Sequence, residues 1–166
     1  MTAFGADVKG YKGKDTHVDL FVGSELAPRF FGWGIPTGPN EGRIGIATTL
    51  PHKPMPFFRD YFLKGAPSKL LGGAKIINLI SGLIPFGVAS PSYADNIILT
   101  GDAAGMAKPT SGGGIYSGLI SADAAFEVAS KALNSGNLSS ANLSEYQALI
   151  VNRIGGELTK GSYLRK

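Results

Sequence analysis

The residues of this chain best suited to chemistry lie in one segment of its second half. An apolar run, Ile97–Leu99, leads into Gly101 and Asp102, and a short loop then carries Pro109 before three consecutive glycines, Gly112–Gly114. A strand that ends in a carboxylate presents it at the sheet edge where open α/β folds bind ligands. Glycines let the backbone approach a ligand, and a helix beginning there offers unpaired N–H groups and the positive end of its dipole. The pattern predicts a site for a polyhydroxylated, anionic or electron-rich ligand.

Other kinds of site fit the sequence less well. A P-loop is excluded because Lys108 is not part of the required Gly-Lys-Ser/Thr order. Ser111 has no Gly-x-Ser-x-Gly elbow around it, and His17 and His52 are far apart, so we predict neither a serine nucleophile nor a metal site. We assign no catalytic residue. The glycine-rich segment could also be a strand–loop–helix junction whose glycines only relieve crowding.

One strand and two helices are expected to position this segment. The wholly apolar run Ile97–Leu99 is typical of a strand in a parallel sheet covered on both faces. A helix is predicted over 113–133, and a last helix from about Asn142. The apolar residues that we expect on the buried face of the first helix are Ile115, Leu119, Ala122, Ala125, Phe126 and Ala129. Those expected on one side of the last helix are Leu143, Tyr146, Ile150 and Ile154.

The first half has the pattern of an antiparallel sheet. The predicted strands are 16–22, 30–36, 43–48 and 74–80, with a helix over 55–63 and a loop over 65–73. The turn sequence at 37–42 separates the second and third strands. The character changes near Pro91, so we predict two parts, residues 1–90 and 91–166. The expected fold class is α/β with α+β character.

Composition limits the class of protein. The chain has 166 residues, of which 43% are apolar and 17% charged, enough for a packed core. Its net charge of +4 is spread along the chain, so we expect no nucleic-acid partner, and the absence of cysteine excludes disulfides within it. No run reaches the ~18 apolar residues of a membrane span, and the first residues do not form a leader peptide. We expect a cytoplasmic protein, compatible with peripheral contact with a membrane.

The segment 101–115 resembles the second FAD-binding motif of flavoproteins of the glutathione-reductase and hydroxybenzoate-hydroxylase type. With its flanking residues it is most similar to the geranylgeranyl reductases, which hydrogenate isoprenoid chains. The resemblance implies FAD as cofactor and assigns roles to Gly101, Asp102, Pro109 and the run Gly112-Gly113-Gly114-Ile115. Asp102 would hold a ribityl hydroxyl and Pro109 would lie beside the isoalloxazine. The N–H groups of Gly113, Gly114 and Ile115 would face the N1/O2 edge, where a helix start favours negative charge.

A second stretch, 27–36, resembles the aromatic signature of the same reductases. There a Pro-x-x-aromatic-x-Trp run ending in proline lines the tunnel for the isoprenoid chain, which implies substrate contacts for Phe31, Trp33 and Pro36. Ile35 stands where the family often has an aromatic residue. Phe31 and Trp33 alternate and share one face of a strand. A core role for both residues is the other interpretation.

The resemblance covers the middle-to-late portion of the reductases. No Gly-x-Gly-x-x-Gly lies between a strand and a helix in residues 1–95, so the N-terminal dinucleotide-binding segment is missing. The expected fold is a partial FAD/NAD(P)-binding flavoprotein fold, with an antiparallel substrate-domain sheet followed by a strand–helix–helix part of the FAD domain. Either the chain is a piece of a longer gene product, which we favour, or it is a natural half that meets a separate nucleotide-binding half.

The expected function is reduction of carbon–carbon double bonds in geranylgeranyl chains for lipid biosynthesis, on an isoprenoid lipid or geranylgeranyl diphosphate. Reduced flavin would supply the hydride, and an external electron donor would reduce the flavin. We expect the isolated chain to be inactive. Two alternatives stay open at this point. One is a flavin monooxygenase or halogenase of the same fold, and the other is a non-catalytic fragment that binds lipid or a partner half.

Overall fold

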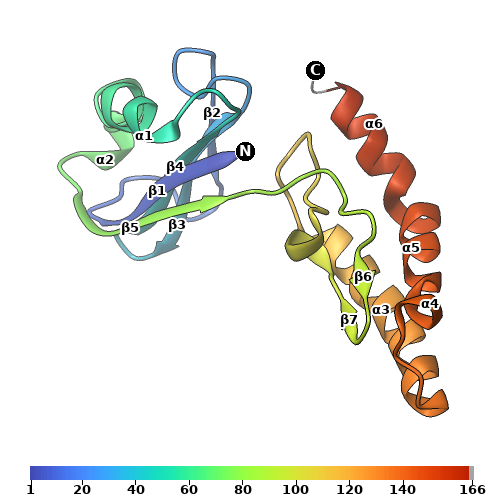
Figure 1. The fold of residues 1–166 in the computed structure, drawn as a ribbon. Coiled ribbons are helices and arrows are strands. Elements are labelled where there is room, and N and C mark those ends of the chain that lie inside the picture. Colours follow the sequence, from blue (N-terminus) through green and yellow to red (C-terminus); the bar gives the residue numbers. More distant parts are fainter. Residues whose placement is uncertain (165–166) are drawn as a thin grey trace. The chain divides into compact units, whose positions relative to one another are not determined.

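The computed structural model describes residues 1–164, apart from the side chain of Tyr61. The chain divides into two compact units, Met1–Leu83 and Ile84–Lys166 (Figure 1). This division precedes the boundary at residues 90 and 91 that the sequence suggested. Each unit has its own cluster of buried residues.

The first unit is built on a five-stranded antiparallel sheet in the order β2-β3-β4-β1-β5. Its strands are β1 (Thr2–Lys9), β2 (Asp19–Val22), β3 (Phe31–Gly38), β4 (Glu41–Thr48) and β5 (Lys75–Leu83). The predicted strands are confirmed, although the first is shortened to β2. Strand β1 is absent from the prediction, yet Phe4, Ala6 and Val8 alternate along it and join the core.

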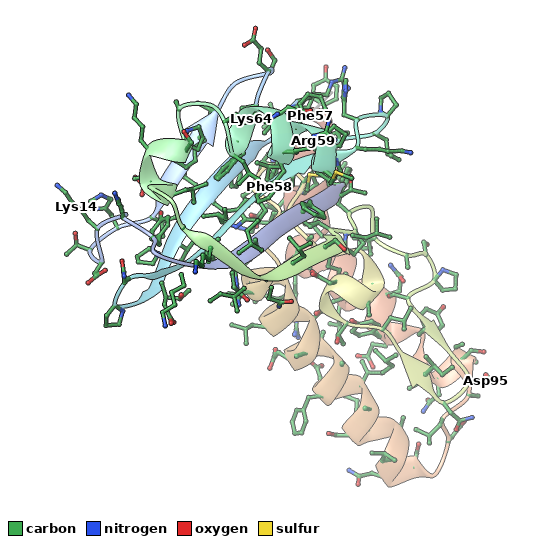
Figure 2. The ribbon with its side chains drawn as sticks, turned by 90° about the vertical axis from the view of Figure 1, so that its left-hand side faces the viewer. Lys14, Phe57, Phe58, Arg59, Lys64 and Asp95 are labelled. Atoms are coloured by element: carbon green, nitrogen blue, oxygen red, sulfur yellow. The ribbon has the colours of Figure 1, made fainter. Side chains whose placement is uncertain are left out.

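Three short helical segments cover one face of this sheet: α1 (Pro54–Phe57), the π-helical η1 (Phe58–Phe62) and α2 (Ser68–Leu71). The predicted helix at 55–63 corresponds to α1 and η1. The predicted loop at 65–73 is wrong, because α2 lies within it. The ring of Phe58 is stacked on Phe62 at 5.5 Å and meets Phe4 edge-on at 5.3 Å. Figure 2 shows Phe57 and Phe58 in this helical layer, with Arg59 and Lys64 on the same segment.

Glycines on β3 allow the core to pack tightly against the strand. A Cβ at Gly32 would lie 2.9 Å from Cε2 of Phe62, and one at Gly34 would collide with the hydroxyl of Tyr11. Residues at 32 and 34 therefore face the core, and the residues between them face the other side of the sheet. These glycines serve close packing of the core.

The second unit contains a small hairpin and a set of helices. Its elements are β6 (Tyr93–Ala94), β7 (Ile97–Ile98), the 3-10 turn η2 (Gly101–Ala104), α3 (Ile115–Ser135), α4 (Ser140–Leu143), α5 (Glu145–Ile150), the π-helical η3 (Val151–Gly155) and α6 (Gly156–Leu164). Strand β7 pairs antiparallel with β6, and Asn96 closes the turn with φ of 62°. The expectation of a parallel strand at Ile97–Leu99 is wrong within the described chain, and Ile97 is 52% exposed.

Helix α3 packs through a different face from the predicted one. Its buried residues are Ser117, Ser121, Ala124, Val128 and Ala132. The predicted face is largely exposed instead, with Ile115 at 83%, Leu119 at 67% and Phe126 at 74%. Both stripes follow a helical repeat, and the stripe of small residues allows α5 to approach closely. Helix α3 therefore presents a second apolar stripe to the outside.

The C-terminal helices agree with the predicted pattern. Leu143, Tyr146, Ile150 and Ile154 are all buried in the core of the second unit. The helical segment begins at Ser140, close to the expected start near Asn142, but the capping residue is Ser139, whose side chain accepts the N–H of Asn142. No helix among residues 1–164 combines the length and apolar character needed to cross a bilayer.

Tyr146 links α5 to the strand that leads to η2. Its hydroxyl donates to the carbonyl oxygen of Leu99 at 2.7 Å, and the side chain is fully buried. Burial raises the pKa of Tyr146 to about 12. The neighbouring Gln147 accepts both the N–H and the hydroxyl of Ser92 at 2.8 Å. These bonds hold the hairpin segment on the helices.

Tyr146 should make the second unit sensitive to alkali. Its pKa is raised from 10.0 to about 12 on folding, so its stabilising contribution is complete below pH ~10 and is lost as the pH rises through 12. We expect Tyr146→Phe to lower the free energy of unfolding by about 1–2 kcal/mol at pH 7. It should also flatten the loss of stability between pH 10 and 12. Chemical denaturation at stepped pH measures both effects, with the exposed Tyr163→Phe as control; parallel curves for wild type and Tyr146→Phe would contradict this role.

Candidate functional site

The carboxylate of Asp102 lies directly against the start of α3. A Cβ placed on Gly114 would be 2.5 Å from Oδ1 of Asp102, so this approach requires glycine at 114. Gly101 adopts φ of 54° where η2 begins, and its carbonyl accepts the N–H of Met106 at 3.0 Å. The turn thus places the exposed Asp102 side chain at the positive end of the helix dipole.

The start of α3 keeps hydrogen-bonding capacity for a ligand. No side chain caps the helix at Gly114, and first-turn N–H groups lack partners within a helix. Gly113 differs, because its N–H donates to the hydroxyl of Ser111 at 3.3 Å. Donors from the helix start and acceptors from Asp102 therefore lie side by side. Such a pair can bind a hydroxyl next to an electron-rich ring edge.

The loop before α3 is closed by backbone hydrogen bonds. The N–H of Gly112 donates to Lys108 at 2.8 Å, and the N–H of Lys108 donates to Gly113 at 2.9 Å. Gly112 has φ of 69°, which favours glycine. Pro109 is buried against α6, where a Cβ on Gly161 would lie 3.3 Å from its Cδ. Pro109 and the three glycines thus lie in the loop between η2 and α3, while the flavin contact expected of Pro109 stays a prediction.

This arrangement is fixed by Ser121, which sequence reasoning did not single out, and by Lys108, which the sequence analysis considered only as a P-loop residue. The hydroxyl of Ser121 accepts the N–H of Gly101 at 3.0 Å and donates to the carbonyl of Gly118 at 2.9 Å. The ammonium of Lys108 lies 2.6 Å from Glu157 on α6 and 4.6 Å above the ring of Tyr116. The spacing of Ser117 and Ser121, one helical turn apart, is the signal that could have revealed the polar contact under η2.

The aromatic residues of β3 face away from the core of the first unit. Phe31 and Trp33 are half-buried and meet edge-on at 6.3 Å, and neither belongs to the buried cluster. The indole of Trp33 lies across Gly45 of β4, where a Cβ would be 2.5 Å from Cζ2. Pro36 pairs with Gly42 and lies on the same face of β3 as Gly32 and Gly34, opposite to Phe31 and Trp33. The structure brings together Phe31 and Trp33 and leaves Pro36 on the core side.

A shallow apolar trough lies beside Trp33 on this open face. It has a volume of about 60 Å³ and is lined by Ala3, Phe4, Gly5, Trp33, Arg43, Ile44, Ile80, Ser81 and Gly82. Gly5 lies in its floor, between its strand partners Gly45 on β4 and Ile80 on β5. A Cβ at Gly5 would collide with the carbonyl oxygen of Ile44. At this volume the trough can hold only a short apolar segment of a longer chain, because ligand pockets are typically several times larger.

Comparison with known proteins gives several relatives named as digeranylgeranylglycerophospholipid reductases. No protein-family model matches the sequence. A digeranylgeranylglycerophospholipid reductase of Methanococcoides burtonii is 33% identical over 144 residues, which cover 84% of this chain and 34% of that protein. The reductase of the same name from Methanothrix thermoacetophila is 28% identical over 151 residues, covering 88% of this chain and 37% of that protein.

Solved structures show the same fold. A geranylgeranyl bacteriochlorophyll reductase-like protein from Thermoplasma acidophilum matches with a TM-score of 0.84 and 23% identity, over 99% of this chain and 42% of that chain. A flavin-dependent brominase matches with a TM-score of 0.65 and 16% identity, over 90% and 40% of the two chains. This chain spans about a third of the length of the curated relatives it matches, and over most of its own length it is similar to geranylgeranyl reductases.

Proposed function

We propose that this chain supplies the substrate sheet and the flavin-edge segment of an FAD-dependent oxidoreductase that reduces double bonds of geranylgeranyl chains. The observation that carries the proposal is the contact of the Asp102 carboxylate with the uncapped start of α3. It occurs in a chain 33% identical to a digeranylgeranylglycerophospholipid reductase. An isoprenoid lipid or geranylgeranyl diphosphate is the proposed substrate.

The residues at the start of α3 fit the ribityl and ring portions of FAD. Asp102 would accept a hydrogen bond from a ribityl hydroxyl, and the N–H groups of Gly114 and Ile115 would bind the pyrimidine edge. The absence of a Cβ at Gly114 supports this fit, because the carboxylate and the helix start can then serve one ligand. Reduced flavin, when bound, would supply hydride to one carbon of the alkene, and a proton would reach the other. The chain's own part is to position the cofactor and to favour negative charge on it.

The open face of the first unit is the proposed wall for the isoprenoid chain. Phe31 and Trp33 provide an aromatic surface, and the trough beside them has an apolar lining apart from Arg43 and Ser81. A branched hydrocarbon needs apolar contact and exclusion of water rather than hydrogen bonds. Trp33 would therefore orient the chain. Pro36 contributes by fixing the backbone of β3 rather than by touching substrate.

The alternatives are less well supported. The flavin-dependent brominase is more distant in fold and sequence than the reductase-like protein, with TM-scores of 0.65 against 0.84. A flavin monooxygenase or halogenase is therefore the second choice. A non-catalytic fragment that binds lipid or a partner half shares the same surfaces and differs only in turnover.

The outward stripe of α3 supports a further partner. Ile115, Leu119, Phe126 and Leu133 are 65–83% exposed along one side of the helix. A helix that is apolar on two opposite sides is typical of one covered on both. We place a nucleotide-binding half, from the same gene product or a separate one, against this stripe. An external electron donor and peripheral contact with a lipid surface complete the proposed working state.

The flavin assignment predicts different effects for a glycine at the site and a glycine outside it. Gly114→Ala should displace the Asp102 carboxylate and weaken riboflavin binding about tenfold, as expected for loss of a hydrogen bond to a charged group. Gly156→Ala, on α6, should leave the affinity unchanged, because a Cβ there has no neighbour within 4 Å. Riboflavin fluorescence titration measures both. Equal affinities for the two variants would argue against a flavin edge at this position.

The position of the Trp33 indole should depend on the absence of a Cβ at Gly45. Gly45→Ala is expected to push the indole out of place, lower the free energy of unfolding by about 1–3 kcal/mol and weaken geraniol binding. Gly82→Ala is the control for stability, since a Cβ there has no neighbour within 4 Å. Chemical denaturation and geraniol titration, both followed by Trp33 fluorescence, test this. An unchanged emission spectrum in Gly45→Ala would refute the placement of the indole.

Complementation tests the reductase activity itself. This chain is co-expressed with the part of the Methanococcoides burtonii reductase that it does not match, and the complex is assayed with FAD, dithionite and digeranylgeranylglycerophospholipid. We expect saturation of double bonds, abolished by Asp102→Ala. Trp33→Ala should reduce turnover at least tenfold while FAD content is retained, consistent with loss of substrate packing of ~2 kcal/mol. Equal loss of FAD and turnover in Trp33→Ala would favour a core role for this residue.

A further inference from the structure

The open face of the sheet changes from apolar to charged along its strands. The row of strand partners at Trp33 contains Leu20, Gly45, Gly5 and Ile80. Two residues further along, the row contains Ile35, Arg43, Asp7 and Asn78, and the last row contains Glu41, Lys9 and Lys75. The alternation of β1 places Gly5, Asp7 and Lys9 on one face. The apolar trough therefore leads into a charged end, about 13 Å from Gly5 to Lys9 along the strand.

Two lysines lie opposite each other at this end of the sheet, on neighbouring strands. Lys9 and Lys75 are direct strand partners on β1 and β5, and both are exposed. Among the described residues, neither makes an ion pair. Glu41 is the other strand partner of Lys9, yet it forms no salt bridge with it. Like charges placed directly opposite destabilise a sheet. An exposed pair of this kind has the chemistry of an anion site.

Arg43 joins the trough to the lysine pair. Its Nε lies 2.8 Å from Oδ1 of Asp7, and this hydrogen bond holds the pKa of the Asp7 carboxyl below its usual range. A guanidinium has five N–H donors, so further donors remain for a second acceptor. Arg43 also lines the trough together with Trp33. Including Asp7 and Glu41, the charged end has three cations and two carboxylates.

We propose that Lys9, Arg43 and Lys75 bind the phosphate group of an isoprenoid phosphate ester whose hydrocarbon lies in the trough beside Trp33. This inference rests on the proposed function and adds a direction to it, with the phosphate at the charged end. The apolar trough and the cations lie on the same face of the same sheet. An isoprenoid phosphate has the matching order of apolar chain and anionic head. Charge-assisted hydrogen bonds from Arg43 can add geometric selection for phosphate oxygens.

The experiment uses the full chain and its single tryptophan. Geranyl diphosphate, geraniol and inorganic pyrophosphate are titrated separately while Trp33 fluorescence is recorded. The test variant carries Lys9→Gln and Lys75→Gln. The control carries Lys14→Gln and Lys69→Gln, which remove the same charge from exposed positions outside the sheet; Figure 2 shows Lys14 on a loop at the edge of the first unit.

We expect geranyl diphosphate to bind the wild type about tenfold more tightly than geraniol at low salt, with the advantage screened at high salt. The double variant should lose this advantage and keep its affinity for geraniol, while the control behaves as wild type. Inorganic pyrophosphate should compete with geranyl diphosphate and leave Trp33 fluorescence unchanged by itself.

Two results would overturn the inference while leaving the proposed function intact: unchanged preference for geranyl diphosphate in the Lys9/Lys75 variant, or an equal loss in the control. If neither geraniol nor geranyl diphosphate altered the fluorescence of Trp33, the isoprenoid wall of the proposed function would fail together with the inference.

Discussion

The alternation of side chains along β3 is the constraint on which the first unit depends. On one side Gly32 and Gly34 leave room for the ring of Phe62 and the hydroxyl of Tyr11, so the core lies close to the backbone. On the other side Phe31 and Trp33 meet no covering layer within this unit and form a surface. One face of β3 therefore packs on the core, and its other face forms an aromatic surface. A glycine has the same role on β4, where Gly45 leaves room for the indole of Trp33 that lies across it.

In the second unit, the main constraint is the position of the Asp102 carboxylate at the start of α3. Asp102 approaches α3 because Gly114 has no side chain and because Ser121 holds the N–H of Gly101 from beneath. The hydrogen bond from Tyr146 to Leu99 fixes the strand that delivers this turn. A carboxylate kept next to helix N–H groups is already stabilised there. The N–H groups of the first turn can also donate to an electron-rich ligand edge that replaces water beside the carboxylate.

Much of the fold could be predicted from the sequence, namely wherever a local pattern is compatible with only one structure. The meander follows from alternating residues between turn signals, and the buried side of the last helix follows from Leu143, Tyr146, Ile150 and Ile154. The predicted face of α3 was wrong because the helix carries two periodic stripes, and packing against α5 selects the smaller one. The glycine-rich run was recognised, but only the three-dimensional approach of Asp102 distinguishes Gly114 from Gly113. Pairing partners such as Lys9 and Lys75 lie far apart in the chain, and no local signal reveals them.

Lys108 connects the C-terminal helix α6 with the glycine-rich loop that precedes α3. Its ammonium is held by Glu157 on α6 and by the ring of Tyr116 in the first turn of α3, while its backbone closes the loop onto Gly112 and Gly113. The ion pair, the ring contact and the packing of Pro109 against Gly161 therefore connect α6 with the loop that precedes the helix start.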